Sequence, residues 1–322
     1  MADYKGIKGF TIPNVSSDPS NPITGQIWYN STTNILKGRV EGFSVGTWSS
    51  GGALNTARSN NGACGTKSAG LFFGGSNPGS TALTESYDGT SWTEVNDLNT
   101  GRIFGSGIGT NTAALYVGGE GPPLDKTETW NGTAWTEVAV LNTDRAKRGG
   151  FGVSTAALVF GGGDPPTITT DTEQWNGTSW TEVNNLNVAV AVTGGAGTTS
   201  AGLQIGGNES EVFVATTEDW NGTSWTETGD LNTARDSMGS AGSSPSSALA
   251  YAGNAPPGVA VTESFNGTAW TEVADLAEAR SGYGNYQAAT TAIMAGGQPT
   301  SPGYTTATEE WSSEATVTVT TS

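Results

Sequence analysis

The sequence predicts an all-β protein, a six-bladed β-propeller with an extended N-terminal arm. Three observations support this prediction: a repeat of 43 to 45 residues that occurs six times, strand-forming stretches within each repeat, and a break in composition near residue 43. Repeats with periods of 20–50 residues are typical of solenoids, propellers and arrays. We therefore expect an arm over residues 1–42, with a β-hairpin in it, and a propeller over residues 43–322.

Three marks recur in fixed phase along the chain. The first is Gly-Thr-x-Trp, which is shortened to Gly-Thr-Trp in its first copy. Its tryptophans are the expected structural residues of the repeat: Trp48, Trp92, Trp135, Trp180, Trp225 and Trp270. The second is an apolar run that ends in two small residues, as in residues 71–75, and the third is Thr-Glu-x-aromatic, as at Glu85 and Tyr87.

The local chemistry within a repeat favours strands. Stretches rich in Thr, Val and aromatic residues are separated by Gly, Asn and Pro, with no helical period between them. Asn-Gly dipeptides such as Asn131-Gly132 predict type I′ hairpin turns, and this recurrence explains Asn-Gly-Thr better than N-glycosylation does. Each repeat is thus predicted to be a four-stranded antiparallel meander, with strands A to D running outward from the axis.

The repeat resembles that of the kelch family. The matching features are the double glycine, an aromatic residue about twelve positions later, the Trp five beyond it and an Arg ten beyond the Trp. The arginines are Arg58, Arg102, Arg145, Arg235 and Arg280. The resemblance covers residues 43 to 311 and implies a propeller. Two positions depart from the pattern: Val190 replaces the Arg of the fourth repeat, and Ala252 replaces a glycine of the fifth.

The order of the marks predicts how the ring closes. The last repeat reaches Trp311 on strand C and no Gly-Thr-x-Trp follows, whereas the first Gly-Thr-Trp has no strands before it. A strand near residues 43–49 is therefore expected to complete blade six and remove its exposed edge. Residues 315–321 alternate Thr with Val and could serve instead as strand D or as an additional outer strand.

The Glu of Thr-Glu-x-aromatic shares a strand face with an aromatic residue, so it should be partly buried and need a partner. The repeat arginine is the candidate, which predicts that Arg102 faces Glu128 and Arg145 faces Glu173. Because Val190 removes this partner, Glu218 should have either a raised pKa or another donor.

The loops that join strands B and C vary between repeats, and variable loops on a rigid frame are where binding sites usually arise. A candidate binding face is formed by the polar residues that begin these loops: Glu120, Asp164, Asn208, Glu209, Asn254 and Gln298. A site for a cation or for sugar hydroxyls is one interpretation, and a hydrated ring is the other.

Composition excludes several kinds of chemistry. Histidine is absent, which removes His bases, His metal ligands and His-assisted nucleophiles, and the single cysteine excludes an internal disulfide. No catalytic residue, cofactor or metal is predicted. A net charge of −17 argues against nucleic acid as a partner. The apolar runs are too short to span a bilayer, and no secretion signal is recognised, so no membrane insertion is expected.

The N-terminal arm has a different composition, with Pro13, Pro19 and Pro22 among Ser and Asn residues. Residues 25–37 form the expected hairpin and resemble short segments of tailed-phage fibre and appendage proteins. The resemblance implies a virion protein, made in the host cytoplasm and present in multiple copies, that docks onto other virion proteins through its arm. The candidate docking residues are Ile12, Ile27, Trp28, Tyr29 and Leu36.

Three functions fit these features. The favoured one is a non-enzymatic phage structural protein of the capsid, neck or tail, such as an appendage, fibre or decoration protein, whose propeller binds a host glycan or receptor. The second is a secreted or surface glycan-binding propeller. The third is a carbohydrate-active enzyme; propellers of the galactose oxidase type use His ligands for copper, which this chain lacks.

Overall fold

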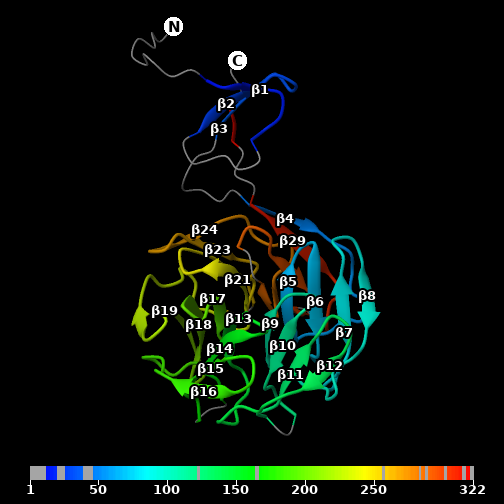
Figure 1. The fold of residues 1–322 in the computed structure, drawn as a ribbon, viewed down its shortest axis with the longest axis vertical. Coiled ribbons are helices and arrows are strands. Elements are labelled where there is room, and N and C mark those ends of the chain that lie inside the picture. Colours follow the sequence, from blue (N-terminus) through cyan, green and yellow to red (C-terminus); the bar gives the residue numbers. More distant parts are fainter. Residues whose placement is uncertain are drawn as a thin grey trace. The chain divides into compact units, whose positions relative to one another are not determined.

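A computed structural model describes residues 12–19, 26–38, 46–121, 124–163, 167–255, 258–282, 284–286, 289–300, 303–313 and 317–319. The chain divides into two compact units. The terminal unit contains Met1–Val45 and Glu314–Ser322, and the propeller unit contains Gly46–Ser313. The described residues form strands and no helix, which confirms the predicted all-β class (Figure 1).

The first five repeats each form a sheet whose strands follow the chain in order. The first sheet consists of β5 (Gly62–Thr66), β6 (Ala69–Phe73), β7 (Thr84–Tyr87) and β8 (Trp92–Val95). The second consists of β9 (Ser106–Gly109), β10 (Ala114–Val117), β11 (Thr127–Trp130) and β12 (Trp135–Glu137). The third consists of β13 (Gly149–Val153), β14 (Ala156–Phe160), β15 (Thr172–Trp175) and β16 (Trp180–Val183).

The fourth sheet consists of β17 (Gly194–Thr198), β18 (Ala201–Glu209), β19 (Val212–Trp220) and β20 (Trp225–Glu227). The fifth consists of β21 (Gly239–Ser244), β22 (Ser247–Tyr251), β23 (Thr262–Phe265) and β24 (Trp270–Glu272). Strand β26 (Gly284–Tyr286) joins the fifth sheet by parallel pairing with β21. Figure 1 shows these sheets following one another around a ring.

The sixth repeat is organised differently from the others. Its three-stranded sheet has the order β27 (Ile293–Ala295), β29 (Thr308–Ser312) and β4 (Thr47–Ser50). A short ladder joins β25 (Arg280–Ser281) to β28 (Gln298–Pro299). Because β26 pairs with β21 and not with β27, the count of six blades stays a prediction from the repeat.

Strand β4 comes from the N-terminal side of the propeller unit and lies at the outer edge of the sixth sheet. It pairs antiparallel with β29, with Trp48 directly opposite Trp311. The Trp48 ring also packs against Tyr251, with ring centroids 5.0 Å apart. The first and last repeats are thus joined in one sheet.

The C-terminal strand corrects two expectations. Strand β30 (Val317–Val319) lies in the terminal unit, where it pairs with β3 (Ile35–Gly38). Val317–Val319 therefore adds no strand to the propeller unit, which ends at Ser313 and not at 322. The reason is that β3 has a free edge in its own hairpin, which an alternating Thr/Val strand can cover.

The Asn-Gly turns also differ from the prediction. Among Asn131 and Gly132, only the glycine has a positive φ, 91°, whereas a type I′ turn needs positive φ at both positions. The Asn131 Oδ1 accepts hydrogen bonds from the backbone N–H groups of Thr133 and Ala134, both 2.9 Å long. The connection is therefore a four-residue loop held by an Asx turn.

The glycine that begins the double glycine has a backbone reason to be conserved among the repeats. It lies in the left-handed region in five repeats, with φ between 51° and 64°. A Cβ on Gly74 would lie 2.8 Å from the Arg102 carbonyl oxygen. Ala252, the departure noted in the fifth repeat, keeps the same conformation with φ 58°, and so carries the strain that glycine avoids.

The repeat tryptophans link neighbouring sheets. Their indole N–H groups donate to the hydroxyl of the Thr that starts Thr-Glu-x-aromatic in the preceding sheet, at 2.9 to 3.2 Å. The pairs are Trp48–Thr262, Trp92–Thr308, Trp135–Thr84, Trp180–Thr127 and Trp270–Thr217. Trp225 and Thr172 occupy the sixth such position but make no hydrogen bond between these atoms.

Candidate functional site

The segments that join one sheet to the next are fixed by buried ion pairs. Arg102 lies 2.8 Å from Glu128, and Arg145 lies 2.9 Å from Glu173, which confirms the two predicted pairs. Arg58, Arg235 and Arg280 pair in the same way with Glu85, Glu263 and Glu309. Burial lowers the pKa of Arg145, and the nearby Glu173 opposes that effect. These arginines are therefore structural.

Glu218 has no arginine partner among the residues that the structure describes, and it keeps the loop donors that its counterparts also have, such as Asn99 for Glu128. It is buried and accepts hydrogen bonds from the Asn187 backbone N–H, the Asn187 side-chain amide and the Val188 backbone N–H. The amide bond is 2.6 Å long and the two backbone bonds are 2.9 and 3.0 Å. Asn232 and Thr233 give the same set of bonds to Glu263, so these donors belong to the repeat and do not replace the arginine.

Four candidate residues occupy equivalent points at one end of the ring. Glu120, Asn208 and Asn254 each form a bridge with a residue just before the innermost strand of their repeat, namely Ile103, Ala191 and Asp236. Gln298 pairs with Ser281 in the same way. The structure therefore brings the starts of these loops to the same end as the connections between sheets. We call this end the loop face.

The other two candidates fall elsewhere. Glu209 is exposed near the tip of the extended hairpin of β18 and β19, where Ser210 and Glu211 form the turn with φ of 50° and 73°. The segment beginning at Asn208 was expected to be a loop, and it is a continuation of two strands. Asp164 lies outside the described residues.

A chain of backbone hydrogen bonds supports the loop face from within. Five residues at the same repeat position have left-handed φ values between 51° and 59°: Asn60, Phe104, Lys147, Val192 and Ser237. The N–H of Phe104 donates to the Asn60 carbonyl at 2.8 Å, and each following member donates to the one before it, as far as Gly282. Because left-handed backbone is unfavourable for Val and Phe, these bonds must hold it in place.

Two charged side chains of the loop face, Lys147 and Asp236, have polar partners. The Lys147 ammonium lies 3.2 Å from a Glu120 oxygen and 5.3 Å from the centre of the Phe104 ring. The Asn208 amide donates to Asp236 over 3.3 Å. Burial raises the pKa of Asp236, and hydrogen bonds from Ser237, Asn208 and Asn254 oppose this shift.

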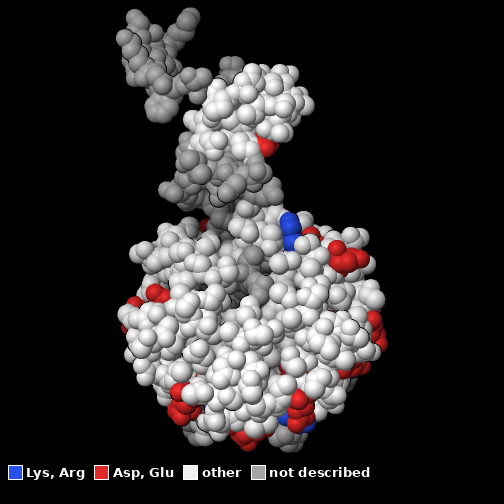
Figure 2. Space-filling model, in the orientation of Figure 1, with Lys and Arg blue, Asp and Glu red and all other residues white. Residues whose placement is uncertain are grey.

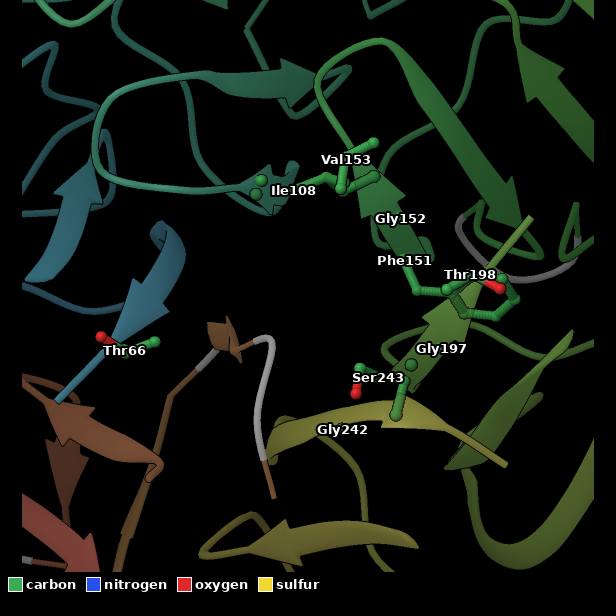
Figure 3. Close-up of a pocket in the computed structure, with 13 residues that line it drawn as sticks. Thr66, Ile108, Phe151, Gly152, Val153, Gly197, Thr198, Gly242 and Ser243 are labelled. Carbon is green, nitrogen blue, oxygen red and sulfur yellow. The ribbon is translucent and has the colours of Figure 1, made fainter. Parts of the chain in front are cut away.

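The hollows formed by the described residues of the propeller unit include one at each end of the innermost strands. A cavity of about 390 Å³ opens at the ends of the innermost strands, opposite to the loop face along those strands, with Thr66, Ile108 and Val153 around it (Figure 3). A smaller polar cleft of about 260 Å³ lies on the loop face and includes Asn254 and Gln298. The sequence analysis missed the cavity, although the alternating glycines of these strands, as in Gly107-Ile108-Gly109, indicate room at the axis.

Acidic side chains surround the circumference of the propeller unit (Figure 2). The outer strands contribute a series of exposed carboxylates: Glu94, Glu137, Glu182, Glu227 and Glu272. Each lies directly across the strand pair from a buried Glu, as Glu137 does from Glu128. Like charges opposite one another repel, and in four of these five repeats a buried arginine pairs with the buried Glu.

The candidate docking residues are divided between two faces of the terminal sheet. In β2 (Ile27–Asn30), Ile27 and Tyr29 share one face, and Leu36 lies directly opposite Tyr29 on β3. Ile27 is 50% exposed and Ile12 is 45% exposed. Trp28 lies on the other face and is buried, so its role is in folding this unit. The remaining strand of this sheet, β1 (Asn14–Val15), pairs in parallel with β2.

Asp18 organises the buried face of the terminal sheet. Its carboxylate accepts hydrogen bonds from the Asn30 amide at 2.8 Å and the Trp28 indole at 3.0 Å, and it pairs with the Lys37 ammonium at 2.5 Å. These interactions, the Asn30 bond above all, lower the pKa of Asp18 to about 2.

Comparison with known proteins identifies the fold. No family model matches the chain. No curated protein sequence matches it. Among solved structures 229 chains match, and one of these, titled "Structure of YjhT", aligns with a TM-score of 0.65 and 11% identity over 80% of this chain and 96% of that chain. Such a likeness concerns the fold alone. Together with the ring of four-stranded sheets, it defines this chain as a β-propeller protein.

The described residues contain neither a metal-binding cluster nor a membrane-spanning helix. No three His, Cys, Asp or Glu side chains within the described ranges gather closely enough to hold a metal ion. The described part of the chain also contains no helix with the length and apolarity needed to cross a membrane.

Proposed function

We propose that this chain is a non-enzymatic structural protein of a tailed-phage virion, with a kelch-type propeller displayed on the capsid, neck or tail. The observation that carries the proposal is the terminal unit. Segments from both ends of the described chain form one small sheet, β1–β2–β3–β30, that is compact by itself. Its β2–β3 hairpin is the segment that resembles phage appendage proteins.

The terminal unit has the features of an anchor. Its fold is stabilised by the Asp18 network, so its other face is available for contact. That face presents Ile27, Tyr29 and Leu36, and an exposed apolar face on a small sheet is typical of an interaction surface. We infer that other virion proteins bind there.

The propeller supports a non-enzymatic role because its repeated charged groups are used in folding. Five of the six repeats hold a buried Arg–Glu pair, so these arginines are not free to bind an anionic substrate. The polar cleft on the loop face favours a second function, binding of a glycan, which agrees with attachment to a host surface. A secreted glycan-binding propeller is the alternative.

Copurification tests the proposal. Particles from cells that produce the protein would be separated on a density gradient, and their proteins quantified by mass spectrometry. We expect the chain in the particle fraction at a fixed ratio to the major capsid protein, also after a wash in high salt. Its presence in the soluble fraction alone would refute the virion role.

A further inference from the structure

The polar cleft lies between the variable loops of the fifth and sixth repeats. It is lined by Asn254, Gly258, Ser281, Gln298, Pro299 and Thr300. None of these residues is charged, and four of them offer an amide or a hydroxyl. The cleft is therefore a small hollow lined by neutral hydrogen-bonding groups.

Backbone pairing holds both walls of the cleft. On one wall, Ser281 and Gln298 are direct partners in the β25–β28 ladder. On the other, Asn254 exchanges two backbone hydrogen bonds with Asp236, of 2.8 and 3.1 Å. The Gly253 N–H donates to the Arg280 carbonyl at 3.0 Å and ties the walls together. The hollow is thus formed before any ligand arrives.

Gly258 and Thr300 approach each other beside the cleft. An added Cβ on Gly258 would lie 3.3 Å from the Thr300 methyl group, so the two loops are in close contact there. Gly258 has a φ of 91°, which suits glycine and shapes the turn beside the hollow. The cleft thus lies between this contact and the β25–β28 ladder.

Polar groups in the cleft are available to a ligand. In the described part of the chain, the side chains of Ser281, Gln298 and Thr300 make no hydrogen bond with another protein group. The Gln298 carboxamide has two donors and an acceptor, and each hydroxyl both donates and accepts. Such groups match a ligand that also donates and accepts at neighbouring atoms.

The corresponding positions in other repeats are occupied differently. In the second repeat the pair is Ile103 and Glu120, and Glu120 is engaged by Lys147. In the fourth it is Ala191 and Asn208, and the Asn208 amide donates to Asp236. Only Ser281 with Gln298 combines two neutral polar side chains that remain free, among the described residues. The junction of repeats five and six is therefore distinct.

We propose that this cleft binds one sugar unit of a neutral glycan. Vicinal hydroxyls of a sugar pair naturally with a carboxamide and with Ser or Thr hydroxyls. A volume of about 260 Å³ is below that of pockets for drug-sized ligands and suits a single ring. The net charge of −17 disfavours anionic sugars. The inference deepens the proposed function and rests on its assumption that the propeller meets a host surface.

Saturation-transfer NMR on the full chain tests the inference. The probes are glucose, galactose, N-acetylglucosamine and, as an anionic comparison, N-acetylneuraminic acid. We expect transfer to at least one neutral sugar, and affinity about tenfold weaker in the double variant Ser281→Ala/Gln298→Ala, which loses hydrogen bonds from both walls. Ser59→Ala, the buried counterpart of Ser281 in the first repeat, should bind like the parent.

Thermal unfolding of each variant shows whether a loss of binding reflects misfolding. Transfer to no neutral sugar, equal binding by the double variant, or stronger binding of N-acetylneuraminic acid would overturn the inference. The virion role is judged separately by copurification. If the protein binds a sugar but stays in the soluble fraction, the virion role is refuted and the sugar site is supported. If it associates with particles but binds no sugar, the sugar site is refuted and the virion role is supported.

Discussion

At the scale of single residues, the fourth repeat shows how one function of a missing arginine is taken over by a neighbouring strand. In the second repeat, Arg102 donates both to Glu128 and to the Gly118 carbonyl, the latter at 2.7 Å. In the fourth, Asn187 donates to Glu218 as Asn99 does to Glu128, while the buried Gln204 amide donates to the Gly206 carbonyl at 2.6 Å. Gln204 thus supplies the arginine's bond to the backbone carbonyl, and Glu218 keeps only the loop donors.

We expect Gln204→Leu to destabilise the propeller by about 1–3 kcal/mol, because the buried Gly206 carbonyl and Thr193 hydroxyl would lose their donor. Met294 occupies the equivalent position in the sixth repeat. Met294→Leu keeps the side-chain volume nearly constant and should lower the free energy of unfolding by less than about 1.5 kcal/mol. Denaturant unfolding measures both. Equal effects would show that Gln204 acts through packing alone.

Asp18 makes the terminal unit sensitive to acid. Its pKa in the folded state is about 2, below the ordinary value of 3.8, so its stabilising effect is complete above pH 4 and is lost as the pH falls towards 2. The NMR signal of the Trp28 indole N–H should shift across this range, and Asp18→Asn should remove that transition. A Trp28 signal that is insensitive to pH in the parent would contradict the assignment.

At the scale of elements, neighbouring sheets are joined by a hydrogen bond from a repeat Trp to a Thr. This bond is missing at one of the six equivalent positions. Trp180 donates to Thr127 at 3.0 Å, whereas Trp225 and Thr172 are buried without a partner for these two atoms. The Trp225 ring is therefore held in the core by apolar contacts. Its ring centroid lies 5.0 Å from that of Phe160.

The missing hydrogen bond predicts unequal effects of the same substitution. Trp180→Phe should reduce the free energy of unfolding by about 1 kcal/mol more than Trp225→Phe, since only the former loses a hydrogen bond. Both variants lose a similar ring volume, so each is the control for the other. Denaturant titration gives the comparison, and equal losses would mean that the indole N–H contributes nothing to stability.

Closure of the ring predicts a contrast between two short deletions. Removing residues 46–50 takes away β4 with its Trp48 contacts and exposes β29, so we expect a much lower melting temperature. Removing residues 314–322 takes only β30, which pairs outside the propeller unit, and should leave propeller melting unchanged. Equal melting of the two deletions would contradict this role of β4.

Much of this architecture follows from the sequence because its marks repeat. The period, the Arg102–Glu128 pair and the shared end of the variable loops are all consequences of one repeated unit. Features that occur only once in the chain leave no repeated pattern in the sequence, so they were not predicted. The partner of Val317–Val319 depends on a free edge far away in the chain, and the replacement of an arginine by Gln204 has no repeated signal. The cleft likewise depends on which loops meet at one junction.

At the scale of the whole molecule, the two compact units differ in the side chains that they carry. The propeller unit holds most of the acidic residues around its rim, and it uses its buried charges for folding (Figure 2). The terminal unit combines a hairpin with a strand from the far end of the sequence. Such a division is what an anchored display protein requires: one part to bind the assembly and another to face outward.

Particle incorporation of a chain reduced to residues 46–313 tests the central claim most directly. The full chain and this variant would be produced together, and their amounts on purified particles compared by quantitative mass spectrometry. We expect the variant to remain folded, as judged by its melting curve, and to be absent from particles that contain the full chain. Equal incorporation of both would contradict the claim that the terminal unit is the anchor.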